Sequence, residues 1–66
     1  MHTYNVVLHY NNGTVKPYML TNVVGHNENE AISMVHETMV ELLRRANRTR
    51  QEIIDAISIK SITMDI

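Results

Sequence analysis

The chain of 66 residues contains no cysteine, tryptophan or phenylalanine, a single proline and only two glycines. Without cysteine there can be no disulfide scaffold, no Cys-based zinc site and no thiol nucleophile. The glycines, Gly13 and Gly25, are too few and too far apart for a glycine-rich phosphate loop. All three aromatic residues are tyrosines, so a Phe or Trp platform for stacking nucleic-acid bases is also missing.

Long apolar runs are missing as well. Crossing a bilayer takes about 20 consecutive apolar residues, and the polar start MHTYN lacks the basic and apolar regions of a signal peptide. With the absence of cysteine, this predicts a cytoplasmic protein without a membrane span. The length predicts one domain over residues 1–66, near the lower limit for independent folding.

Net charge is only −1, but the charges are segregated along the chain. Residues 27–43 carry four glutamates and no Lys or Arg, and residues 44–50, RRANRTR, carry four arginines. The overall balance argues against a strongly basic nucleic-acid binder and against an acidic DNA mimic. The arginine-rich segment is therefore the sharpest local charge feature.

Residues 3–10 alternate with a period of two, which predicts a strand. Asn12-Gly13 follows and favours a two-residue hairpin loop, because both central residues of a type I′ turn need positive φ. Pro17 cannot donate to a strand ladder, so the second strand is expected at the edge of the sheet.

A two-residue loop would also fix the register of this hairpin. It pairs Tyr10 with Val15 and Val6 with Met19, which collects one mostly apolar face. The opposite face of the two strands would then hold Val7, His9, Tyr18 and Leu20.

The segment HNENEAISMVHETMVELLRRA predicts an amphipathic helix from about residue 28 to about residue 46. Asn27 is a good N-cap, and Glu30 stands three positions later, as a helix start requires. The apolar residues recur in one stripe, which contains Ala31, Ile32, Val35, Met39, Leu42, Leu43 and Ala46.

The residues after this helix predict a second, shorter one. Asn47 can end the first helix, and TRQE at 49–52 fits a capping box that starts a helix through about Ala56; one kinked helix is the alternative. The β-branched end ISIKSITMDI predicts a strand. Its alternation changes phase between Ile59 and Ile62, which indicates a bulge or burial on both faces.

The resulting order predicts an α+β fold of the type ββα(α)β. A right-handed crossover would place the third strand beside the first, giving a three-stranded antiparallel sheet of order 2-1-3 with one amphipathic helix on one face. The other face would remain uncovered, and a small monomer rarely exposes a large apolar patch. We therefore expect an oligomer or partner surface formed by Val7, His9, Tyr18, Leu20, Met34 and Val40.

A homodimer would use this surface most simply, because two-fold dimers are the commonest oligomers. The alternative is a monomer with scattered apolar residues on its surface.

Four histidines invite a metal or acid-base role: His2, His9, His26 and His36. None of them has a recognised ligand spacing, and HETMV at 36–40 lacks the second histidine of a zinc-protease helix. No Ser, His and Asp constellation for nucleophilic catalysis is present either. We expect no metal, no cofactor and no catalytic residue, and hence no enzyme.

Four arginines, Arg44, Arg45, Arg48 and Arg50, define a predicted arginine corner between the two helices. They could contact the phosphates of RNA or DNA. However, a helix dipole favours cations in the last turn, and the spacing allows Glu41 to pair with Arg45 and Arg48 with Glu52. Because arginine also binds carboxylates in a bidentate manner, the corner favours an acidic protein surface over a nucleic-acid backbone.

The stretch VVGHNENEAI at 23–32 resembles the strand, short acidic loop and helix start of many short phage and prophage proteins. The preceding hairpin segment YNVVLHYNNGTV extends the resemblance. Such proteins are often non-catalytic modulators that bind a host or defence protein, so the resemblance implies a phage-encoded inhibitor with a host protein as partner.

Together these features predict a non-catalytic protein-binding modulator that occupies a surface of its partner. The alternative is a small RNA- or DNA-binding regulator that uses the arginine corner. A third possibility is a site for a small anionic ligand between two subunits.

Overall fold

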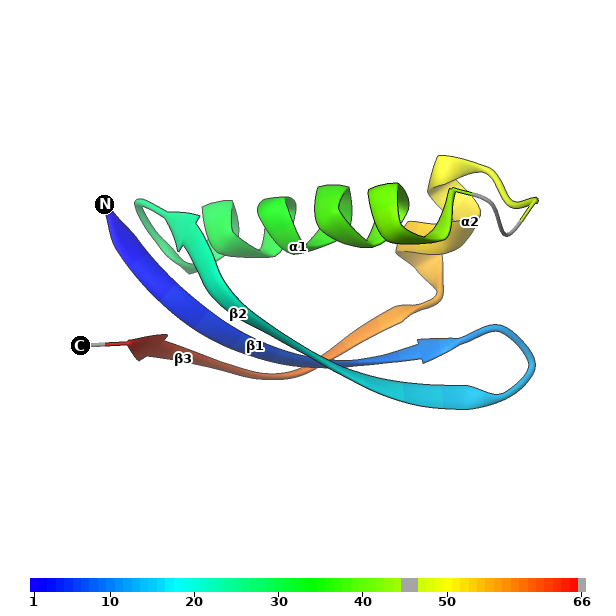
Figure 1. The fold of residues 1–66 in the computed structure, drawn as a ribbon, viewed down its shortest axis with the longest axis horizontal. Helices are drawn as coiled ribbons and strands as arrows, with labels where there is room; N and C mark the ends of the chain where they lie inside the picture. Colours follow the sequence, from blue (N-terminus) through cyan, green and yellow to red (C-terminus); the bar gives the residue numbers. More distant parts are fainter. Residues whose placement is uncertain (45–46, 66) are drawn as a thin grey trace.

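The computed structural model describes residues 1–44 and 47–65. In chain order its elements are β1 (His2–Asn11), β2 (Val15–Gly25), α1 (Glu28–Leu43), α2 (Arg50–Asp55) and β3 (Ile57–Asp65). The strands form one antiparallel sheet of order β2-β1-β3, and both helices lie on one side of it (Figure 1). This confirms the predicted α+β fold, its strand order and the separate second helix. The predicted helix end at Ala46 lies outside the described residues.

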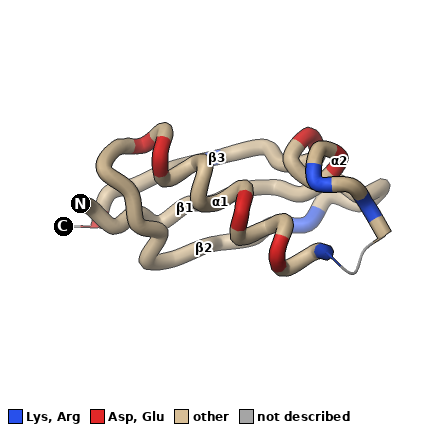
Figure 2. Tube along the Cα trace, turned by 90° about the horizontal axis from the view of Figure 1, so that it is seen from above, with Lys and Arg blue, Asp and Glu red and all other residues tan. Residues whose placement is uncertain are grey.

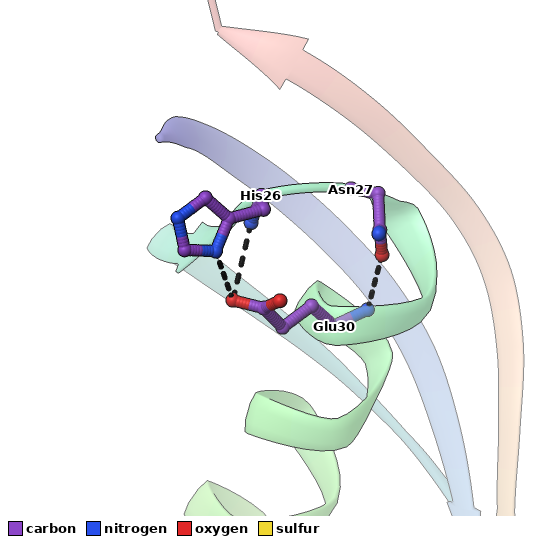
Figure 3. A network of polar contacts seen from close by, with 3 residues as sticks. All are labelled: His26, Asn27 and Glu30. Atoms are coloured by element: carbon purple, nitrogen blue, oxygen red, sulfur yellow. Dashed lines mark hydrogen bonds and ion pairs between the residues drawn. The ribbon is translucent and has the colours of Figure 1, made fainter.

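The start of α1 is held by three consecutive polar contacts (Figure 3). The side chain of Asn27 accepts a hydrogen bond from the backbone N–H of Glu30 at 2.9 Å, as predicted for the N-cap. Oε1 of Glu30 accepts the backbone N–H of His26 at 3.2 Å and lies 2.8 Å from Nδ1 of the His26 ring. These hydrogen bonds from the side chain and backbone of His26 lower the pKa of the Glu30 carboxyl group.

The short helix α2 begins with the predicted capping box. Oγ1 of Thr49 accepts the N–H of Glu52 at 3.2 Å, and Oε1 of Glu52 accepts the N–H of Thr49 at 3.0 Å. At its other end the carbonyl of Ala56 accepts the N–H of Asn11 at 3.0 Å. The helix is thus attached to the hairpin end of β1 before β3 begins.

The hairpin register differs by one residue from the predicted one, because the loop has three residues rather than two. Asn11 pairs with Val15, which leaves residues 12–14 in the loop. The side chain of Asn11 accepts the N–H of Gly13 at 3.0 Å, and that of Asn12 accepts the N–H of Thr14 at 3.3 Å. Such local amide contacts stabilise a longer turn, and only Gly13, with φ of 104°, has positive φ within it.

Each edge strand contains a bulge. In β2 the register shifts opposite the segment between Tyr4 and Val6, where Asn22 adopts a positive φ of 57°. In β3 it shifts between Ser61, which pairs with Val7, and Ile59, which pairs with Leu8. The phase change in the last strand is therefore a bulge at Lys60, one of the two predicted explanations.

The core lies between the sheet and the helices. It contains the alternate residues of β1 together with residues from β2, α1 and α2: Tyr4, Val6, Leu8, Tyr10, Val23, Ala31, Val35, Met39 and Ile53. The buried part of α1 is narrower than the predicted stripe, because Leu42 is exposed and Ile32 and Leu43 are half-buried. The face of the sheet opposite the helices, called the open face below, is covered by no element of the described chain.

Candidate binding surfaces

The residues predicted to form one partner surface are distributed over different parts of the molecule. Val7 and His9 lie on the open face as expected, since they alternate with the core residues of β1, and both are half-buried. Met34 and Val40 lie on α1; Met34 has 46% of its surface exposed, whereas Val40 packs against the core.

Tyr18 and Leu20 do not lie on the open face, so their predicted placement is wrong. Tyr18 pairs with Leu8 and Leu20 with Val6, so they share the helix side of the sheet with these core residues. Both are half-buried and pack against the core. The error follows from the loop, because a register shift of one residue moves every side chain of a strand to the other face.

The same shift places three other residues of β2 on the open face. Val15, Met19 and Val24 are 54%, 66% and 40% exposed, and they pair with Asn11, Val7 and Thr3 of β1. We call these three side chains the β2 ridge. Reading the Asn11 and Asn12 side chains as part of a three-residue loop would have identified the ridge from the sequence.

A groove of about 190 Å³ lies between α1 and the bulged part of β2. It is called the α1–β2 groove and is lined by Leu20, Thr21, Asn22, Val23, Val24, Met34 and Thr38. A shallower hollow of about 480 Å³ continues along α1 and is lined by Glu37, Thr38, Glu41 and Leu42. Thr38 borders both depressions, and the exposed side chains of Met34 and Leu42 stand beside them.

The arginine corner lies where α1 ends and α2 begins. Figure 2 shows basic segments gathered at this end of the molecule and acidic segments along α1. Nη1 of Arg44 lies 3.3 Å from Oε1 of Glu41. Arg50 donates to Oε1 of Glu37 and so links α2 to α1. Two of the cations are thus partly neutralised by glutamates of α1, which weakens the corner as a phosphate site.

The remaining members of the corner contribute less to such a site. Arg48 is half-buried, and no ion pair joins it to Glu52, whose carboxylate accepts the N–H of Thr49 instead. Arg45, and with it the predicted Glu41–Arg45 pair, lies outside the described residues. Arg44 and Arg50 are therefore the members whose contacts the structure defines, and both contacts are to glutamates.

The histidines lie apart from one another. His9 is on the open face, His26 contacts Glu30, and His36 is half-buried on α1. Within residues 1–44 and 47–65, no group of three or more His, Asp or Glu side chains could hold a metal ion. In the part of the chain that the structure describes, no helix is long and apolar enough to cross a membrane.

Comparison of the chain with protein-family models, with curated proteins and with solved structures finds no match. The functional argument below therefore rests on the surfaces of this molecule.

Proposed function

We propose that this chain is a non-catalytic protein-binding module, and that the α1–β2 groove is the contact that occupies its partner. The observation that carries the proposal is the position of two large apolar side chains on α1. Met34 and Leu42 are 46% and 60% exposed, and they flank a groove and a hollow that share Thr38. Exposed apolar side chains gathered beside a groove are typical of a protein interaction site.

The chemistry of this region suits a folded protein as the partner. Met34 is flexible and polarizable, so it can adapt to the apolar side chain that enters the groove. Burying apolar surface there contributes about 25 cal/mol per Å². The pairs formed by Glu37 with Arg50 and by Glu41 with Arg44 border the hollow and provide the polar rim found around most interfaces.

The modulator class implied by the resemblance to phage proteins agrees with such a contact, because a modulator of this kind needs a binding surface and no catalytic group. A host or defence protein is the partner that this reading proposes. The nucleic-acid alternative receives less support, since Arg44 and Arg50 already contact glutamates.

Affinity capture from bacterial lysate, with and without nuclease, tests the proposal. We expect a protein to be retained after nuclease treatment and to be lost when Met34→Glu places a charge beside the groove. Met19→Glu is the matched control, because it changes an equally accessible methionine on the opposite side of the sheet and should retain the partner.

Two results would contradict the proposal. Capture by Met34→Glu at the wild-type level would show that the groove is not the contact. Retention that nuclease abolishes, and that falls steeply with salt and with conversion of the four arginines to glutamine, would instead establish the nucleic-acid function.

A further inference from the structure

We infer that the open face of the sheet docks on the same face of a second copy, so that two chains form a sandwich with their helices outside. The contact would be made by the β2 ridge together with Val7 of the central strand. It uses the side of the sheet opposite the α1–β2 groove, so the inference does not rest on the proposed function.

The spacing of the β2 ridge is symmetric about Met19. The ridge residues Val15, Met19 and Val24 pair with positions 11, 7 and 3 of β1, which are four residues apart. At about 3.3 Å per residue, Val15 and Val24 therefore each lie about 13 Å from Met19. The bulge at Asn22 absorbs the extra residue between Met19 and Val24. Such symmetry is what an interface between identical surfaces requires.

A two-fold axis in the plane of the interface, perpendicular to the strands and passing by Val7 and Met19, matches like with like. It places Met19 on Met19 of the second copy and Val15 on Val24. His9 and Asn5 stand two residues on either side of Val7 and so face each other across the axis. Imidazole and amide groups can hydrogen-bond in either protonation state of the histidine. Apolar groups meet apolar ones and polar groups meet polar ones.

The charges on the open face do not oppose this arrangement. In the described part of β3, the register places on this face the side chains of Ser58, Ser61, Thr63 and Asp65. Asp65 pairs with Thr3, four β1 positions from the axis, so the two copies of Asp65 stand at opposite ends of the interface. Lys16 pairs with the core residue Tyr10 and therefore lies on the helix side.

Pairing of edge strands is the competing arrangement of two copies, and both edges disfavour it. β2 carries Pro17, which has no N–H to donate, and the bulge at Asn22. β3 carries its bulge at the exposed Lys60. Bulges, proline and lysine are the devices by which natural sheets prevent edge-to-edge association. A second copy is therefore directed to the face of the sheet.

The size of the face predicts the strength of the dimer. Three strands of about nine residues cover roughly 30 by 14 Å, or about 400 Å² of flat area on each copy. Two copies then bury about 800 Å² before side-chain relief is counted, which is below the usual 1,200–2,000 Å² of a stable interface by about a third. We expect dissociation in the range of about 1 to 100 μM, so the dimer should depend on concentration.

Sedimentation equilibrium over this concentration range measures the predicted association. The wild-type chain should approach twice its monomer mass, whereas Met19→Glu should remain monomeric because it places two carboxylates at the axis. Met34→Glu, on the helix side, should dimerise as the wild type does. Circular dichroism checks that both variants are folded, which is expected because both side chains are exposed.

Single cysteines test the geometry, because the chain contains none of its own. Facing sheets are about 10 Å apart, so a bis-maleimide linker of about 10 Å should join Met19→Cys to itself. Val15→Cys alone should not cross-link, since its two copies would be about 26 Å apart along the strands. A mixture of Val15→Cys and Val24→Cys should. The inference is overturned by a wild-type chain that stays monomeric throughout, by a Met19→Glu variant that still dimerises, or by efficient cross-linking of Val15→Cys alone.

Discussion

Gly25 joins β2 to α1 at a point where no side chain fits. It is buried, and a Cβ atom built on it would lie 2.8 Å from the backbone nitrogen of Ala31 and 3.1 Å from the carbonyl oxygen of Asn27. The same oxygen accepts the N–H of Ala31 at 3.0 Å, so these atoms belong to the first turn of the helix. The close approach of strand and helix depends on this glycine.

Gly25→Ala should destabilise the protein by about 1–3 kcal/mol, because the added methyl group meets backbone atoms that cannot rotate away. Urea unfolding followed by circular dichroism measures the change. Val24→Ala, at the neighbouring exposed position, is the control and should cost about 0.5 kcal/mol or less. If Gly25→Ala has the stability of the control, the helix is less tightly joined to the strand than the structure shows.

At the scale of the element, α2 depends on its cap. A helix of six residues cannot persist alone in water. It is held by the burial of Ile53, by the reciprocal hydrogen bonds of Thr49 and Glu52, and by the link between Arg50 and Glu37 of α1. An exposed ion pair contributes at most about 1 kcal/mol, so the cap and the buried isoleucine carry most of the stabilisation.

The capping box makes part of this stability dependent on pH. The backbone and hydroxyl hydrogen bonds of Thr49 lower the pKa of the Glu52 carboxyl group below its ordinary value of 4.5. A carboxyl group whose pKa is lower in the folded state contributes stability above its unfolded pKa and loses it as the pH falls through the folded pKa. We therefore expect the urea midpoint of the wild-type protein to fall with acid more steeply than that of Glu52→Gln.

The comparison is made by urea titrations between about pH 7 and about pH 3. Glu28→Gln is the control, because Glu28 is an exposed glutamate that accepts no hydrogen bond from the described residues. An acid dependence of Glu52→Gln identical to that of the wild type would show that the capping box does not stabilise α2.

The elements were predictable from the sequence, and the sheet register was not. Asn27 and the Thr49-Glu52 pair mark the two helix starts through contacts between residues three apart, so local sequence determines them. The Asn12-Gly13 signal is compatible with loops of two or three residues, and here the Asn11 and Asn12 amides decide for three. The bulge at Asn22 is set by pairing with a distant strand, which local sequence does not reveal.

At the scale of the whole molecule, the sheet separates two surfaces of different kinds. The helix side carries the α1–β2 groove with Met34 beside it, and the open face carries the β2 ridge centred on Met19. The sequence predicted that apolar surface would remain uncovered. It could not assign that surface to the two sides, because the assignment of each β2 side chain depends on the register.

The most direct test of the proposed contact uses the methyl groups of the methionines as reporters in NMR spectra. Met34 stands beside the groove, Met19 on the open face and Met39 in the core. When the captured partner is added at constant protein concentration, we expect the Met34 resonance to shift while those of Met19 and Met39 stay in place. A shift of Met19 without a change at Met34 would contradict the account, because the partner would then occupy the open face.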